Sequence, residues 1–92
     1  MSVTYRIEFK PAALRDLKKL PEATVRRIGI AIDGLAKEPR PSGVKKLKGT
    51  GEHVFHRLRV GDYRVIYEVH DDAVLVLVVR IGDRKEIYRL EL

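Results

Sequence analysis

HVFHRLRVGDYRVIYEV, residues 53–69, is the stretch that decides the fold of this chain. Apolar and polar residues alternate on both sides of Gly61-Asp62, which is typical of two half-buried strands joined by a tight turn. The first strand, His53–Val60, then has Val54, His56, Leu58 and Val60 on one face and His53, Phe55, Arg57 and Arg59 on the other. The second, Tyr63–Val69, places Tyr63, Val65, Tyr67 and Val69 opposite Arg64, Ile66 and Glu68. The segment therefore predicts an antiparallel hairpin with one apolar and one basic face.

The residues that follow predict a third strand of the same antiparallel meander. Asp71-Asp72 makes a second turn into Ala73–Ile81, which is apolar on both faces and therefore favours a central position in the sheet. Gly82-Asp83 is expected to end this strand, and Ile87–Leu90 could add a short last one.

The N-terminal part predicts one strand and two helices. Val3–Phe9 alternates as a half-buried strand does. Pro11 suits the first position of a helix whose apolar spacing comes from Ala13, Leu14, Leu17 and Leu20. The opposite face of this helix, expected to meet solvent, carries Arg15, Asp16, Lys18 and Lys19. After Pro21 a second helix follows, with its apolar stripe at Val25, Ile28, Ile32 and Leu35. Gly29 and Gly34 each cost that helix about 1 kcal/mol relative to Ala, which close packing against the neighbouring helix would explain.

Residues 38–51 predict an irregular basic connector, because they are interrupted by Pro39, Pro41, Gly43, Gly49 and Gly51. The whole pattern predicts an α+β fold of one domain, residues 1–92, in the order β-α-α-β-β-β. An N-terminal strand and a helical hairpin precede the antiparallel meander, and the hairpin packs on one face of the sheet. The uncovered face then collects Arg57, Arg59 and Arg64.

The charge of the chain points to a polyanionic partner. Its 92 residues carry 19 Lys and Arg against 13 Asp and Glu, a net charge of +6, and residues 40–64 alone carry 7 − 2 = +5. Such a patch suits RNA, DNA or an acidic protein, although basic loops also simply keep small proteins soluble. The chain has no cysteine, which excludes disulfides and thiolate metal sites. No apolar run is long enough for a membrane span, so a cytoplasmic protein is expected.

The residues present suit one reaction better than others. His53, His56 and His70 are too scattered for a metal site, and His56 fits a structural role on the apolar face. Cleavage of RNA by its own 2′-hydroxyl needs no metal-activated water, only in-line geometry, a proton acceptor, a proton donor and cations for the phosphorane. Arginine matches phosphate oxygens with its planar fork. The composition permits a ribonuclease of this kind without establishing one.

Three motifs carry a resemblance to a known family. They are KLKG at residues 46–49, RLRVGDYRVIY at residues 57–67 and IGDRKEIY at residues 81–88. With them, nearly the whole chain resembles the RelE/ParE toxin superfamily, and its GxR…Y ending resembles the RelE branch of type II toxin–antitoxin systems more than the gyrase-poisoning ParE branch. The resemblance implies a RelE-like fold and a ribosome-dependent, metal-independent mRNA endonuclease without a cofactor. It also implies mRNA, the ribosome and a RelB-like antitoxin as partners, the last in a possible hetero-oligomer.

The resemblance also implies roles for individual residues. The catalytic candidates are Arg57, Arg64, Arg84 and Tyr88. Arg64 would stabilise the scissile phosphate, Arg84 would hold phosphate or assist the leaving group, and Tyr88 would act on the 2′-hydroxyl or stack on a base. Candidates for binding RNA and the ribosome are Lys45, Lys46, Lys48, Arg59 and Phe55.

Two positions depart from the family pattern, and each leaves alternatives open. Phe55 stands where relatives often have a lysine, and it could stack on a base or dock the antitoxin. Asp83 stands where many relatives have a histidine, and it could replace a catalytic group or only form a turn. Arg84 could pair with Glu86 or Asp83, and Arg64 could be a solvated strand residue. The alternatives in function are a ParE-type inhibitor that binds DNA gyrase and a non-catalytic module whose basic face only binds an acidic antitoxin or RNA.

Overall fold

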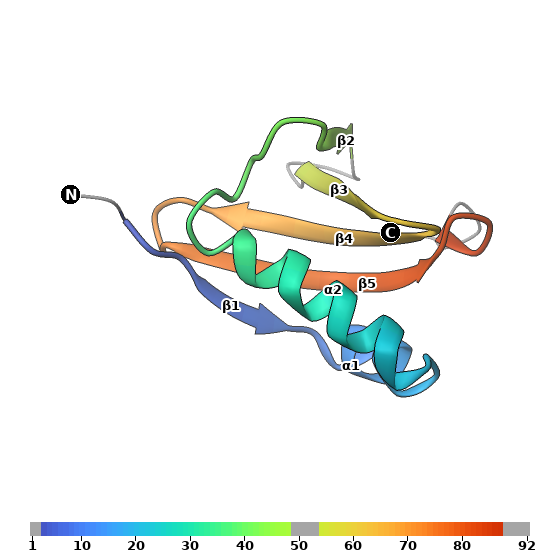
Figure 1. Ribbon diagram of the computed structural model, residues 1–92. Coiled ribbons are helices and arrows are strands. Elements are labelled where there is room, and N and C mark those ends of the chain that lie inside the picture. Colours follow the sequence, from blue (N-terminus) through green and yellow to red (C-terminus); the bar gives the residue numbers. More distant parts are fainter. Residues whose placement is uncertain (1–2, 49–53, 88–92) are drawn as a thin grey trace.

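The computed structural model describes residues 3–48 and 54–87 and confirms the α+β class. Its elements are β1 (Arg6–Phe9), α1 (Pro11–Lys18), α2 (Glu22–Gly34), β2 (Lys45–Lys48), β3 (Val54–Val60), β4 (Tyr63–His70) and β5 (Leu75–Asp83). The five strands form one sheet in the order β1-β5-β4-β3-β2. β1 runs parallel to β5, and all other neighbours are antiparallel. Both helices lie on one face of this sheet, as predicted (Figure 1).

The turn between β3 and β4 has the predicted two-residue loop. Val60 pairs with Tyr63, and Gly61 has a φ of 58°. A positive φ at the first loop residue only is the type II′ hairpin geometry, which glycine adopts at little cost. Arg57 therefore pairs with Ile66 and Arg59 with Arg64. This register puts all three arginines on the face that the helices leave uncovered.

The main core lies between the helices and the sheet. Ile28, Ile32 and Leu35 of the predicted α2 stripe are buried against Val65, Tyr67, Val76 and Val78. A second, smaller cluster lies on the opposite face and consists of Phe55, Ile66, Val79 and Ile87. The pairing of β4 with β5 contains a β-bulge: Ile66 pairs with Arg80 and Tyr67 with Val78, so that Val79 is the extra residue of β5. Val79 belongs to the smaller cluster.

Several sequence-based boundaries were wrong. Residues 45–48, expected to be irregular, form the edge strand β2 on β3. β5 begins at Leu75 instead of Ala73, because Ala73 and Val74 belong to the turn, where Val74 has a φ of 50°. Gly82 and Asp83, expected to interrupt this strand, are instead its last two residues and pair with Arg64 and Tyr63. The expected strand at 87–90 lies outside the described residues apart from Ile87.

The packing predicted for four helical positions was also wrong. Leu14 is 47% exposed, whereas Asp16, expected on the solvent side, is buried. A methyl group added at Gly29 or Gly34 would meet no atom within 4 Å outside its own helix, so close packing does not explain these glycines.

Asp16 is buried because its carboxylate lies at the edge of β5 beyond the end of β1 and accepts hydrogen bonds from β5 there. β1 pairs with β5 only up to Val78. Beyond it, the Asp16 carboxylate accepts the Ile81 N–H at 2.9 Å and the Arg80 guanidinium at 2.8 and 3.1 Å. Burial alone raises the pKa of Asp16, but the hydrogen bonds from Arg80 and Ile81 outweigh it and lower the pKa below its usual range. This contact fastens α1 to the sheet.

We expect Asp16→Asn to lower the free energy of unfolding by about 3 kcal/mol at pH 7, because it leaves the partly buried charge of Arg80 without a carboxylate. Since the folded pKa is lowered, the advantage of wild type exists above about pH 4 and shrinks as the pH falls through the folded pKa. Urea unfolding at pH 7 and pH 3 measures both effects. The exposed Asp33→Asn serves as the control, and equal stability of the two variants at pH 7 would contradict the assignment.

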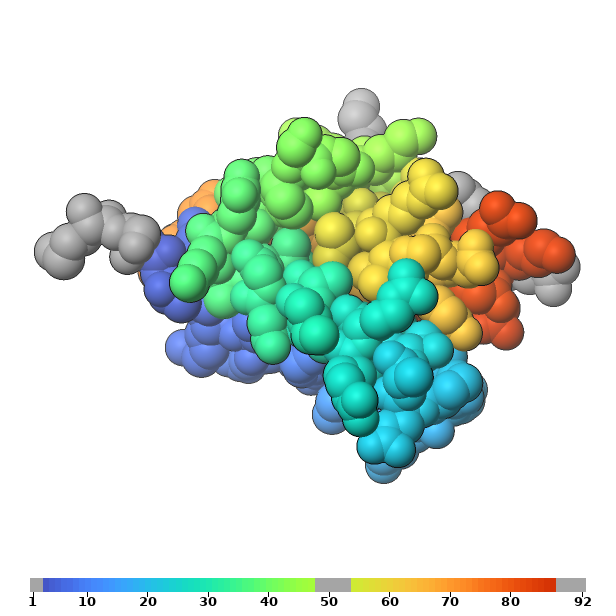
Figure 2. All heavy atoms as spheres, viewed as in Figure 1, coloured from blue at the N-terminus to red at the C-terminus, as the bar shows by residue number. Residues whose placement is uncertain are grey.

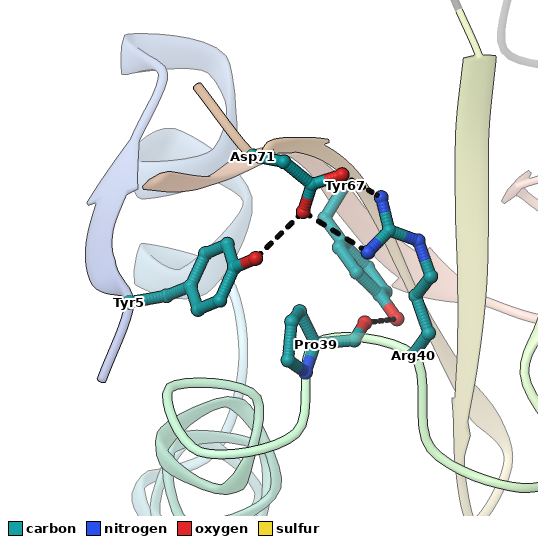
Figure 3. Close-up of polar contacts among 5 residues, drawn as sticks. All are labelled: Tyr5, Pro39, Arg40, Tyr67 and Asp71. Carbon is teal, nitrogen blue, oxygen red and sulfur yellow. Dashed lines mark hydrogen bonds and ion pairs between the residues drawn. The ribbon is translucent and has the colours of Figure 1, made fainter. Parts of the chain in front are cut away.

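The connector between α2 and β2 is fixed to the end of the sheet by long-range polar contacts (Figure 3). The Arg40 guanidinium donates to both carboxylate oxygens of Asp71, at 3.1 and 2.9 Å. Tyr5 donates to the same carboxylate at 2.6 Å, and Tyr67 donates to the Pro39 carbonyl at 2.7 Å. These contacts fix the position of the connector, which leads directly into β2. They therefore help to place β2, and with it Lys45, beside β3.

Candidate RNA-binding site

A small cavity on the uncovered face brings four of the predicted site residues together. It has a volume of about 220 Å³ and is lined by Gly43, Lys45, Arg57, Arg59 and Arg64. Three strands contribute: Lys45 of β2 pairs with Arg57 of β3, and Arg59 of β3 pairs with Arg64 of β4. Among the described residues no carboxylate lines this cavity. The cavity is therefore strongly cationic and suited to a phosphate.

Arg64 is held rigidly instead of being solvated. It is only 9% exposed, and its Nη1 donates to the carbonyls of Gly61 and Tyr63, both at 2.9 Å. These two bonds use one nitrogen of the guanidinium and fix its plane against the turn. A charge that is positioned in advance stabilises a developing anion better than a mobile one does.

Arg84 reaches the same turn from β5. Its backbone N–H donates to the Asp62 carbonyl at 2.8 Å, and its side chain is exposed, with no ion pair to Glu86 or Asp83. Asp83 instead accepts the backbone N–H groups of Lys85 and Glu86, at 2.9 and 2.7 Å. In this structure Asp83 therefore closes a turn, and that turn presents Arg84.

The arginine pair Arg59–Arg64 is unfavourable for stability by itself. Like charges directly opposite each other on two strands repel. Within the described residues Arg59 is exposed and has no salt bridge. A bound polyanion would remove the repulsion, so the pair is better explained by binding than by folding.

Lys46 lies apart from this cluster. It pairs with His56 in the register, faces the other side of the sheet and lines a separate cavity of about 610 Å³ together with Arg40, His56 and His70. His56 is buried there and stacked on Tyr67, with 5.4 Å between ring centroids. Burial, with Arg40 and Lys46 nearby, lowers the pKa of His56, so the predicted structural role fits a neutral ring.

The remaining predicted residues are not in the cavity. Phe55 is 7% exposed and packs in the second cluster, so its ring is not open to a base in this structure. Lys48 pairs with Val54 at the end of β2. Tyr88 and His53 lie outside the described residues. In the parts of the chain that the structure describes, no group of three or more His, Asp or Glu could hold a metal ion, and no helix is long and apolar enough to cross a membrane.

The residues that support the site were not predicted from the sequence. Arg40 and Asp71 position β2, although they are 31 residues apart. Gly43 lines the cavity with a φ of 91°, and the Pro41-Ser42-Gly43 turn pattern was the one local signal for it.

The fold and the site together define a small α+β domain with an arginine cluster on its uncovered face, in which Arg64 is held by the β3–β4 turn. Comparisons with known proteins agree. Residues 7–88 match the family described as ParE toxin of type II toxin-antitoxin system, parDE. Toxin RelG of Mycobacterium tuberculosis is 33% identical over 89 residues, covering 92% of this chain and 97% of that protein. The mRNA interferase toxin RelE of Escherichia coli K12 is 28% identical over 88 residues, covering 94% and 92%.

A solved structure shows the same fold. The RelE of the archaeal RelE–RelB complex from Pyrococcus horikoshii superposes with a TM-score of 0.77 at 36% identity, covering 89% of this chain and 97% of that one. The chain belongs to the RelE/ParE family of toxins of type II toxin–antitoxin systems, and its named relatives are of the RelE type.

We expect Arg64→Ala to lower the free energy of unfolding by about 1–2 kcal/mol, because it leaves two turn carbonyls without their donor. Arg59→Ala, on the partner strand, should leave stability unchanged or raise it slightly, because it removes the like-charge neighbour. Urea unfolding of both variants measures the difference. If Arg59→Ala proves the more damaging of the two, the described role of Arg64 is wrong.

Proposed function

We propose that this toxin is a RelE-type endoribonuclease that cleaves mRNA on the ribosome and thereby inhibits translation in the cytoplasm. The observation that carries the proposal is the cavity on the uncovered face, where Lys45, Arg57, Arg59 and Arg64 converge. The relative in Escherichia coli that is named an mRNA interferase supports RNA as the substrate. The relatives solved as RelE–RelB complexes support a RelB-like antitoxin as a partner.

The proposed reaction is an internal transesterification that needs no metal ion. The 2′-oxygen attacks the adjacent phosphorus, the bond from phosphorus to the 5′-oxygen breaks, and the products carry a 2′,3′-cyclic phosphate and a 5′-hydroxyl. The proton of the 2′-hydroxyl leaves to a base, and the departing 5′-oxygen gains one. Arg57, Arg64 and Arg84 would stabilise the charge on the phosphorane, and Tyr88 is the candidate for proton transfer or base stacking.

Arg84→Gln tests this assignment most cleanly, because the exposed Arg84 side chain has no partner within the described residues and its loss should not affect folding. We expect the variant to lose about 10²-fold or more in cleavage of mRNA on ribosomes, as removal of one charge stabiliser does. Arg6→Gln on β1, at the far edge of the sheet, is the control and should cleave as wild type does. Mapping of mRNA 5′ ends after induction measures the cleavage, and wild-type activity in Arg84→Gln would refute the role of Arg84.

Metal independence has its own test. Purified protein treated with EDTA should cleave ribosome-bound mRNA at an unchanged rate, after magnesium has been restored for the ribosome alone. The new 5′ ends should accept phosphate from a kinase without prior phosphatase, and a 2′-deoxy residue at the cleavage position should prevent cutting. New 5′-phosphate ends would instead show hydrolysis by an activated water.

A ParE-type gyrase inhibitor is the second candidate, because the matching family carries the ParE name. The same induction experiment separates the two. Gyrase-linked DNA breaks with intact mRNA would indicate the ParE activity, and neither lesion, with growth unaffected, would indicate a binding module.

A further inference from the structure

An additional arginine touches the turn that positions Arg64 and Arg84, and it comes from the helical side. A methyl group built on Gly61 would lie 2.6 Å from Nη2 of Arg27 and 3.3 Å from the central carbon of its guanidinium. Arg27 belongs to α2, which covers the opposite face of the sheet from the arginine cluster. Figure 2 shows the teal atoms of α2 directly against the yellow atoms of β3. The guanidinium therefore lies against the turn, and a Cβ at position 61 would displace this flexible side chain.

The Arg27 charge is not used for folding. Within the described residues it has no hydrogen bond and no ion pair, and it is exposed. Asp62, the carboxylate of the same turn, forms no ion pair with it in the described part. The adjacent Arg26 differs, because it lies 3.6 Å from Glu22 one helical turn earlier. Arg26 thus forms the ion pair between positions i and i+4 that is common on helix surfaces, whereas Arg27 forms no such pair among the described residues.

The turn itself has its carbonyls engaged. Arg64 donates to the Gly61 and Tyr63 carbonyls, and the Arg84 N–H donates to the Asp62 carbonyl. Arg27 and Arg64 thus contact Gly61 from the two faces of the sheet. Cationic groups gathered at one turn without a paired carboxylate repel one another unless an anion is supplied. Arginine is also the side chain best suited to hold a phosphate.

We propose that Arg27 forms a second phosphate-binding subsite, on the α2 side of the Gly61 turn. There it binds a phosphate of the RNA strand outside the scissile one. The strand then passes from the uncovered face round the end of the β3–β4 hairpin to α2. This inference rests on the proposed function for its substrate, and Arg27 acts in binding alone, without touching the reacting atoms.

The test is binding of a 12-nucleotide single-stranded RNA with 2′-O-methyl riboses, which the protein can bind but not cut. Fluorescence anisotropy between 50 and 200 mM KCl gives the affinity and its salt dependence. We expect Arg27→Gln to weaken binding about fivefold at 0.1 M salt and to reduce the slope of log K against log salt by about 0.7, as the loss of one phosphate contact does. Arg27→Lys keeps the charge and should bind within about twofold of wild type.

Arg26→Gln is the matched control, because it removes the same charge from the adjacent position of the same helix. Equal losses in Arg26→Gln and Arg27→Gln would mean attraction by net charge only and would overturn the subsite. Binding of RNA by Arg27→Gln with wild-type affinity would also overturn the subsite. A third contrary outcome is an Arg27→Lys variant that binds RNA as weakly as Arg27→Gln and has a lowered Tm, because Arg27 would then stabilise the turn instead of binding phosphate. A loss confined to capture of the antitoxin would assign Arg27 to that partner instead and overturn the proposal.

The binding test is independent of cleavage. If wild type binds the 2′-O-methyl RNA and loses that binding in Arg27→Gln, but cuts no mRNA on ribosomes, the proposed endoribonuclease fails and the subsite stands. If wild type cuts mRNA and Arg27→Gln binds RNA as wild type does, the subsite fails and the proposed function stands.

Discussion

The β3–β4 register is the constraint on which the rest of the molecule depends. Gly61 has the positive φ that a type II′ loop needs at its first position, so the loop has two residues and Val60 pairs with Tyr63. Side chains alternate along a strand with a period of two, so a slip by one residue would turn every one of them to the other face. Tyr67 would leave the core, and Arg64 would enter it. The same turn thus fixes the hydrophobic core and the cationic face.

The site is built on the β3–β4 hairpin and costs stability there. Arg59 and Arg64 face each other across two strands, and Arg27 adds a further charge on the other side of the turn. The fold offsets this repulsion elsewhere. The Asp16–Arg80 pair ties α1 to β5, and the Arg40–Asp71 pair ties the connector to the turn before β5. Among the described residues these two ion pairs lie away from the cavity, and no carboxylate of that part of the chain lines the cavity itself.

Local pattern predicted most of the fold but only part of the site. The strand faces of Arg57, Arg59 and Arg64 followed from alternation alone. Leu14 and Asp16 were assigned to the wrong sides of α1, because helical spacing does not reveal that Asp16 accepts hydrogen bonds from residues more than 60 positions later. Lys45 and Lys46 were both assigned to the surface that binds RNA and the ribosome. The connector was not expected to contain a strand, but β2 places these two side chains on opposite faces of the sheet. Phe55 was expected on the ligand surface, but Val79 and Ile87 cover it there.

The sequence by itself determined the α+β class, the hairpin and the basic face, because each depends on residues that are neighbours along the chain. Only the tertiary structure decided which charges are engaged and which are available. Asp16 meets Arg80, Asp71 meets Arg40, and Arg27 meets Gly61, and each of these contacts joins segments at least 31 residues apart in sequence. Such contacts follow from how the helices lie over the sheet, and no periodicity in a single segment records that arrangement.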